Sequence, residues 1–144
     1  MSTLNEQLYM DAVVVYGAGR TFSVSIKRPT EETANLANPT FEALDLSPYN
    51  VRFRVLGSAT ADATVLIEKI ITQVSTPSEE GQIDNPENGE FTFTITANDT
   101  KTLGLGYHPI MIQLLDSTTE EVVYTLTEGG IAQSEFTKIQ VVRI

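Results

Sequence analysis

Alternation of apolar and polar residues at every second position is the feature that most constrains how this chain folds. Such a two-residue period is typical of a strand with one buried face, because successive side chains point to opposite sides of a sheet. The period recurs in the segments 21–27, 49–57 and 88–97. The side chains that it predicts to point inward are Phe22, Val24, Ile26, Val51, Phe53, Val55, Phe91, Phe93 and Ile95. Arg52 and Arg54 then point outward, toward solvent or a partner.

About seven or eight such strands follow one another with turn signals at short spacing, which predicts an all-β fold, a single antiparallel β-sandwich. "DSTT" between two of them, 116–119, indicates a hairpin. Residues 62–72 are rich in β-branched side chains, which favours a strand, although a short helix is an alternative. No long segment has a helical period, so an alternating strand–helix plan is excluded. We expect one sandwich domain over 13–144.

The segment 1–12 stands before the first clear strand and carries apolar residues. Leu4 and Leu8 are four positions apart, so one helical turn would place them on one face. With Tyr9 and Met10 they form a candidate partner-binding arm, a tether for a neighbouring subunit. The alternative is an added edge strand, since "DAVVVY" suits strand addition, either to a partner or to the domain's own sheet.

The composition disfavours several classes of partner and site. Among 144 residues, 19 carboxylates face 9 lysines and arginines, giving a net charge of −10. That balance argues against nucleic acid and anionic membranes as partners. There is no cysteine, so disulfides, thiol nucleophiles and thiolate metal sites are excluded. We see no secretory signal and no apolar run of the roughly 20 residues that a membrane span needs.

The stretch "VVVYGAGRTF", 13–22, raises the question of a dinucleotide site. The fingerprint needs a third glycine and a following helix whose amides hold the pyrophosphate. Here the third glycine position is Phe22, and strand period follows. We therefore expect a turn between strands, with Gly17 and Gly19 at positive φ.

Three further features have structural interpretations. His108, the single histidine, has no accompanying triad motif, so we expect a rim histidine. "DNPENGE", Asp84–Glu90, gathers oxygen ligands but lacks the spacing of a calcium loop, so we expect a turn. Asn98 is expected to cap one helical turn that ends at Gly104. We predict no catalytic residues, no cofactor and no metal.

Several segments resemble the small immunoglobulin-like domains of tailed-bacteriophage virions, such as the N-terminal domain of baseplate upper proteins. These segments are "RTFSVSIKRP", "LDLSPYNVRFRV", "NGEFTFTITANDTKTL" and "GYHPIMIQLLDSTTEEVVYTL". The likeness covers roughly 20–143 and implies an immunoglobulin-like sandwich without enzymatic activity. Here the chain ends at the sandwich, which fits a head decoration protein better than a baseplate component.

These observations predict a structural protein of a phage virion, most simply a capsid decoration or cement protein on the head lattice. It would be assembled in the cytoplasm of the bacterial host and bind the major capsid protein, with a homo-oligomer expected. A neck, tail or baseplate component is the first alternative. A carbohydrate- or ligand-binding β-sandwich module is an alternative of another class.

Overall fold

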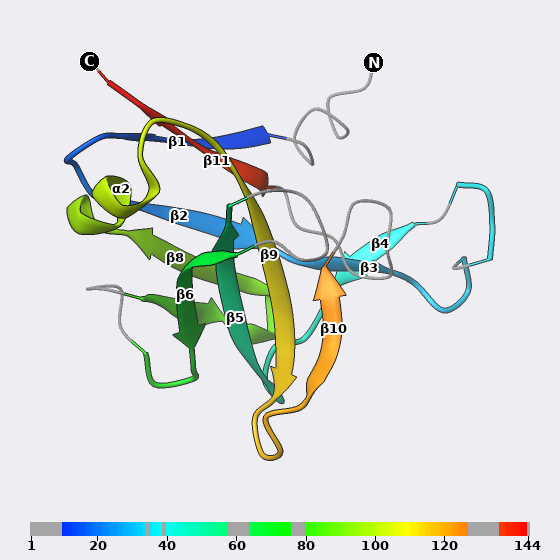
Figure 1. The fold of residues 1–144 in the computed structure, drawn as a ribbon. Coiled ribbons are helices and arrows are strands. Elements are labelled where there is room, and N and C mark those ends of the chain that lie inside the picture. The colour runs from blue at the N-terminus through cyan, green and yellow to red at the C-terminus, as the bar shows by residue number, and fades with distance from the viewer. Residues whose placement is uncertain are drawn as a thin grey trace.

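A computed structural model describes residues 10–33, 35–38, 40–57, 64–75, 80–126 and 136–143. Strands dominate these residues, with one short α-helix and one 3₁₀ turn (Figure 1). The strands are β1 (Met10–Val15), β2 (Arg20–Ser25), β3 (Lys27–Pro29), β4 (Phe41–Ala43), β5 (Tyr49–Leu56), β6 (Val65–Ile71), β7 (Gly81–Asn85), β8 (Glu90–Ile95), β9 (Gly106–Asp116), β10 (Val122–Leu126) and β11 (Phe136–Val142). The helices are η1 (Pro86–Asn88) and α2 (Ala97–Leu103).

Two sheets form the body of the domain. The larger has the order β1-β11-β9-β5-β6, with β10 also paired to β9, and the smaller has the order β2-β8-β7. In chain order these are the G-F-C-C′ and B-E-D sets of a variable-type immunoglobulin sandwich. The predicted all-β, immunoglobulin-like sandwich is therefore confirmed, and 65–71 is a strand rather than a helix.

Two details differ from the sequence prediction. The described residues hold eleven strands rather than about eight, since β3, β4 and β7 are too short to show a clear period. In addition, β1 runs parallel to β11, whereas the remaining pairs in the described part of the chain are antiparallel. β3 and β4 form a separate two-stranded sheet that projects from the body (Figure 1).

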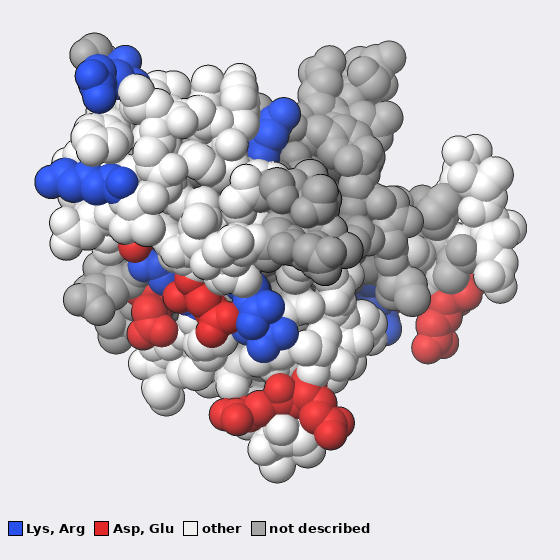
Figure 2. Space-filling model, viewed as in Figure 1, with Lys and Arg blue, Asp and Glu red and all other residues white. Residues whose placement is uncertain are grey.

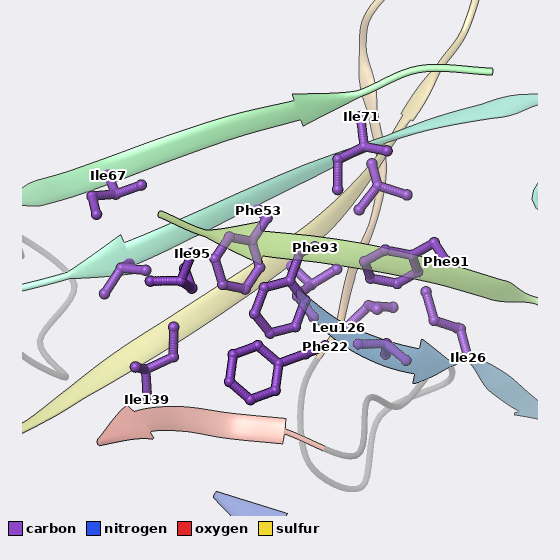
Figure 3. Close-up of a cluster of buried hydrophobic side chains, with 14 of the residues drawn as sticks. Phe22, Ile26, Phe53, Ile67, Ile71, Phe91, Phe93, Ile95, Leu126 and Ile139 are labelled. Atoms are coloured by element: carbon purple, nitrogen blue, oxygen red, sulfur yellow. The ribbon is translucent and has the colours of Figure 1, made fainter. Parts of the chain in front are cut away.

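The core lies between the two sheets and contains the side chains that the alternation predicts (Figure 3). Phe93 of β8 stands at its centre. Its ring stacks on Phe22 at a centroid distance of 5.1 Å and on Phe53 at 4.2 Å. Phe53 comes from the larger sheet, so this stack joins the two layers. All nine predicted inward residues are buried, and Arg52 and Arg54 are only partly exposed on the opposite face.

The helix α2 begins two residues earlier than the sequence analysis expects. Its N-cap is Thr96, not Asn98: the Thr96 hydroxyl accepts from the Asp99 amide, and the Asp99 carboxylate accepts from the Thr96 amide. This capping box gives hydrogen-bond acceptors to two backbone amides, those of Thr96 and Asp99. A cap at Asn98 would not form this reciprocal pair. As predicted, the helix ends at Gly104. The Gly104 amide donates to the Thr100 carbonyl oxygen.

Asp99 also links α2 to the larger sheet. Its Oδ2 lies 2.7 Å from Lys69 Nζ of β6, and the Lys69 side chain is only 9% exposed. One carboxylate thus serves both the helix cap and a largely buried ion pair. Removing it leaves the ammonium group without this partner in a poorly hydrated site.

We predict that Phe93→Ala lowers the free energy of unfolding by about 3–5 kcal/mol, because it removes the central ring and leaves a cavity. Urea unfolding followed by circular dichroism measures the change. Val74→Ala, an exposed apolar truncation, serves as the control and should fall within about 0.5 kcal/mol of the wild type. Equal effects of the two substitutions would contradict the central role of the stack.

We predict that Asp99→Ala destabilises the domain more than Lys69→Met. The first removes one of the two capping-box hydrogen bonds, that from the Thr96 amide to the Asp99 carboxylate, and leaves the ammonium group without this carboxylate. The second removes the charge but keeps an apolar stem of similar length. The midpoints of urea unfolding show which variant loses more stability. Lys101→Met, on the exposed side of α2, is the control. A larger loss for Lys69→Met would show that the interpretation is wrong.

Candidate functional site

The candidate arm is only partly within the described residues. Leu4, Leu8 and Tyr9 lie outside them, while Met10 begins β1. β1 pairs in register with β11 from Ala12 to Val15, so this part of the chain is an edge strand of the domain's own sheet. Of the alternatives that the sequence leaves open for "DAVVVY", the structure shows this one.

The glycine stretch is a turn between β1 and β2, and no helix follows it. Gly17 has a φ of 82°, as expected, and its amide donates to the Thr100 hydroxyl of α2 over 2.8 Å. The expectation of positive φ is wrong for Gly19, whose φ is not positive. A Cβ at Gly19 would lie 3.3 Å from the Ile95 carbonyl oxygen, so its small size serves a close approach to the end of β8.

His108 is half-buried at the start of β9, and its Nε2 lies 3.0 Å from the Gly104 carbonyl oxygen. A His108 ring N–H that donates to this carbonyl oxygen holds the end of α2 against β9. Loop 84–90 forms the expected turn: η1 connects β7 to β8, and Gly89 closes it at a φ of 70°. Burial, with the nearby Glu90 charge, raises the pKa of Asp84. No group of three or more potential metal ligands occurs within the described ranges.

A polar recess of about 410 Å³ lies on the projecting β3–β4 hairpin. Its lining includes Arg28 and Glu42, which form an exposed ion pair at 3.3 Å. The hydroxyls of Thr30 and Thr40 are bonded to each other and to Thr33. The recess is open, and Arg28, Glu42 and the threonine hydroxyls already have partners, so the arrangement by itself points to no particular ligand.

The outward face of β5, β6 and β9 carries paired polar side chains rather than free charges. Arg54 Nε donates to Glu68 Oε2 over 2.6 Å, and Arg52 Nε donates to Gln113 Oε1 over 2.9 Å. Gln113 in turn donates to the Thr125 hydroxyl of β10. The two arginines predicted to face outward therefore have neighbours within the sheet.

The opposite end of the same face differs in character. Val13 of β1, Gln140 of β11 and Tyr107 of β9 form one cross-strand row, and Tyr107 is 58% exposed. Lys138 Nζ lies 4.9 Å from the Tyr107 ring centroid, and the Arg143 guanidinium lies 5.7 Å from that of Tyr16. We define the basic-aromatic patch as Val13, Tyr16, Arg20, Tyr107, Lys138 and Arg143. Arg20 joins it through a 2.8 Å hydrogen bond from its guanidinium to the Val13 carbonyl oxygen.

The far end of β9 carries the acidic tip, which we define as Asp116, Glu120 and Glu121. It lies at the β9–β10 hairpin, where Figure 2 shows acidic side chains at the lower edge of the molecule. The Asp116 carboxylate accepts hydrogen bonds from the amides of Thr118 and Thr119 at 2.8 and 2.9 Å. Next to the tip, Val122 and Val123 are 46% and 45% exposed. Sequence reasoning missed the basic-aromatic patch because it depends on which strands are neighbours, whereas the acidic tip lies within the predicted hairpin.

No family model and no curated protein matches the chain. Among solved structures the chain is similar to the NK cell receptor Nkp44, a triggering partner in natural cytotoxicity, with 17% identity and a TM-score of 0.38. The likeness covers 92% of this chain and 99% of that one. The immunoglobulin-like fold rests on the strand order and not on this likeness. Within the described residues, no helix is long and apolar enough to cross a membrane.

We predict that Asp116 titrates below its ordinary pKa of 3.8, because the Thr119 and Thr118 amides bond to its charged form. Because the pKa of Asp116 is lower in the folded chain, the stabilisation of the hairpin by its ionised carboxylate is fully present when the pH is above the pKa of Asp116 in the unfolded chain. It is lost as the pH falls through the lower, folded value. Carboxyl chemical shifts in an NMR titration measure the pKa. A value at or above 3.8 would contradict the hydrogen-bonded turn.

Proposed function

We propose that the chain is a non-enzymatic structural protein of a bacteriophage virion, a decoration protein that binds the head lattice. The sequence segments that resemble phage immunoglobulin-like domains support this. They correspond to β2, β5, the β8–α2 unit and the β9–β10 hairpin, which together supply strands to both sheets. The resemblance thus follows the framework of the sandwich rather than one loop.

The free edge of β1 is the observation on which the proposal depends. In the larger sheet β1 is the last strand, with β11 on one side and no strand from the described residues on the other. Edge groups of this kind pair with a further strand from a partner chain, with backbone hydrogen bonds giving affinity. Two carbonyl oxygens of β1 already have acceptor bonds within the chain, that of Val13 from the Arg20 guanidinium and that of Val15 from the Ala18 amide, so a partner strand would use the remaining groups or displace Arg20. The chain before β1 carries Leu4 and Leu8, so two apolar side chains precede that edge in the sequence. A lattice of major capsid protein subunits would bind both features.

A neck, tail or baseplate protein would use the same edge against a different ring of subunits. The ligand-binding alternative has one specific observation in its favour, the polar recess on the β3–β4 hairpin. Its lining is rich in carboxylates and threonine hydroxyls, groups that pair with the hydroxyls of a sugar. The two classes therefore place the contact on different parts of the molecule.

We predict that the purified chain binds phage heads produced without it, and that Leu4→Ser with Leu8→Ser weakens binding by about tenfold or more, since two apolar anchors are lost. Co-sedimentation with heads, and separately with tails, measures binding. Thr3→Ala with Asn5→Ala is the matched control in the same segment and should bind as the wild type does.

Binding to tails but not to heads would move the proposal to the neck, tail or baseplate. Failure to bind any part of the particle, together with binding on a glycan array that Glu42→Gln reduces, would replace it with the ligand-binding module.

A further inference from the structure

The edge strand β1 has little protection of its own against pairing with another chain. It carries one charged residue, Asp11, and none from Ala12 to Val15. β6, at the other end of the same sheet, carries Glu68 and Lys69, and charges on an edge strand discourage edge-to-edge pairing. An apolar edge strand without such charges is a template for association between copies. Protection of the stretch that ends at Val15 therefore has to come from outside it.

Two outward carbonyl oxygens of β1 are occupied by groups from outside the strand. The Tyr16 amide donates to β11, so the backbone groups of Val13 and Val15 point the other way, because successive residues of a strand alternate. The Val15 oxygen accepts from the Ala18 amide over 2.9 Å, within the turn that leads to β2. The Val13 oxygen accepts from the Arg20 guanidinium over 2.8 Å. The first bond belongs to the backbone of the turn, whereas the second belongs to a side chain that can rotate away.

Arg20 reaches this oxygen from the opposite sheet. β1 belongs to the larger sheet and β2 to the smaller, and one turn joins them (Figure 1). Arg20 and Phe22 are two positions apart on β2, so both point toward the interior of the sandwich. Phe22 is buried in the core, whereas Arg20 stands at the end of the strand and is exposed. Inward-pointing charged residues are one device by which natural sheets block their edges.

The core determines where the guanidinium lies. Arg20 Cζ is 4.6 Å from the centroid of the Phe22 ring, which itself stacks on Phe93. A planar guanidinium stacks well on an aromatic face and loses little freedom for each hydrogen bond that it forms. Arg20 is thus positioned at the Val13 oxygen although it is exposed, and it can leave without breaking a backbone hydrogen bond.

We propose that Arg20 is a latch on the β1 edge, which keeps two copies of the free chain from pairing β1 with β1. When Arg20 is displaced, Val13 of each copy can exchange both N–H···O bonds with the other in an antiparallel pair about a two-fold axis. When Arg20 is in place, the Val13 oxygen is engaged and the guanidinium stands where the second strand would lie. This goes beyond the proposed function, because it concerns pairing between copies of the purified chain. A capsid strand that adds to the same edge would first displace Arg20.

Arg20→Met tests the latch, since methionine keeps an apolar side chain near Phe22 but removes the donors. Sedimentation velocity over a range of concentrations should show about tenfold or more tighter self-association than in the wild type, because the edge can now bond to a second copy. The substitution makes the chain more acidic, which by itself opposes association. Arg28→Met on the β3–β4 hairpin makes the same change in charge and should behave as the wild type does.

Arg20→Met combined with Val13→Pro separates edge pairing from mere exposure of the Phe22 ring. Proline removes the outward amide of Val13 without removing a bond to β11, a position at which edge strands tolerate it. The double variant should return to the association of the wild type. Hydrogen exchange gives a second measurement: the outward amide of Val15 should become protected in concentrated Arg20→Met, because it then donates to the second copy. Circular dichroism and thermal unfolding check that every variant is folded.

Three results would overturn the proposal. If Arg20→Met associates no more than Arg28→Met, the edge is closed without Arg20. If it associates equally with and without Val13→Pro, the contact lies on the uncovered Phe22 ring and not on β1. An unprotected Val15 amide in associated Arg20→Met would have the same meaning, whether or not the proline variant folds. Because no phage component is present, failure here and failure to bind heads are separate outcomes.

Discussion

Stacking of Phe93 between Phe22 and Phe53 is the interaction on which the rest of the structure depends. An immunoglobulin sandwich in antibodies joins its two sheets with a disulfide beside a buried tryptophan. This chain has neither cysteine nor tryptophan, so aromatic rings take on the role of holding β2 and β8 against β5. Offset ring contacts add a small favourable energy to the large area that each ring buries. With the layers fixed, the outward side chains of the larger sheet occupy defined positions, and the candidate surfaces follow from them.

The inward side chains were predictable from sequence, and the reason is physical. A strand with one buried face must place apolar residues on that face, and a slip of one residue would expose all of them. Phe22, Phe53 and Phe93 stand in uninterrupted two-residue repeats, so their direction was unambiguous. The short strands β3, β4 and β7 were missed because three to five residues carry too little periodicity. The helix cap was misplaced since Thr96 and Asn98 are both good N-cap residues, and only Asp99 three positions on favours the first.

The candidate surfaces were much less predictable. The sequence pattern does not show that β11 lies between β1 and β9, the arrangement that brings Lys138 beside Tyr107. The basic-aromatic patch exists only because β1 and the start of β2 lie beside β9 and β11, which come much later in the chain. The same holds for Gly19, whose small size is required by the backbone of β8 and not by its own φ. Features of this kind depend on contacts between distant segments, which local patterns do not encode.

The position of β11 has a consequence for how the protein reaches its folded state. Among the described residues, the last strand, β11, is the one to which the first, β1, is bonded, through pairs such as Val13 with Gln140 and the hydrogen bond from the Tyr16 amide to the Val142 carbonyl oxygen. The two strands are separated by most of the sequence, so β1 lacks its partner until a long loop has closed, which is a slow step in folding. Until then the stretch "DAVVVY" is without the strand that covers one of its edges, which leaves it open to pairing with other chains.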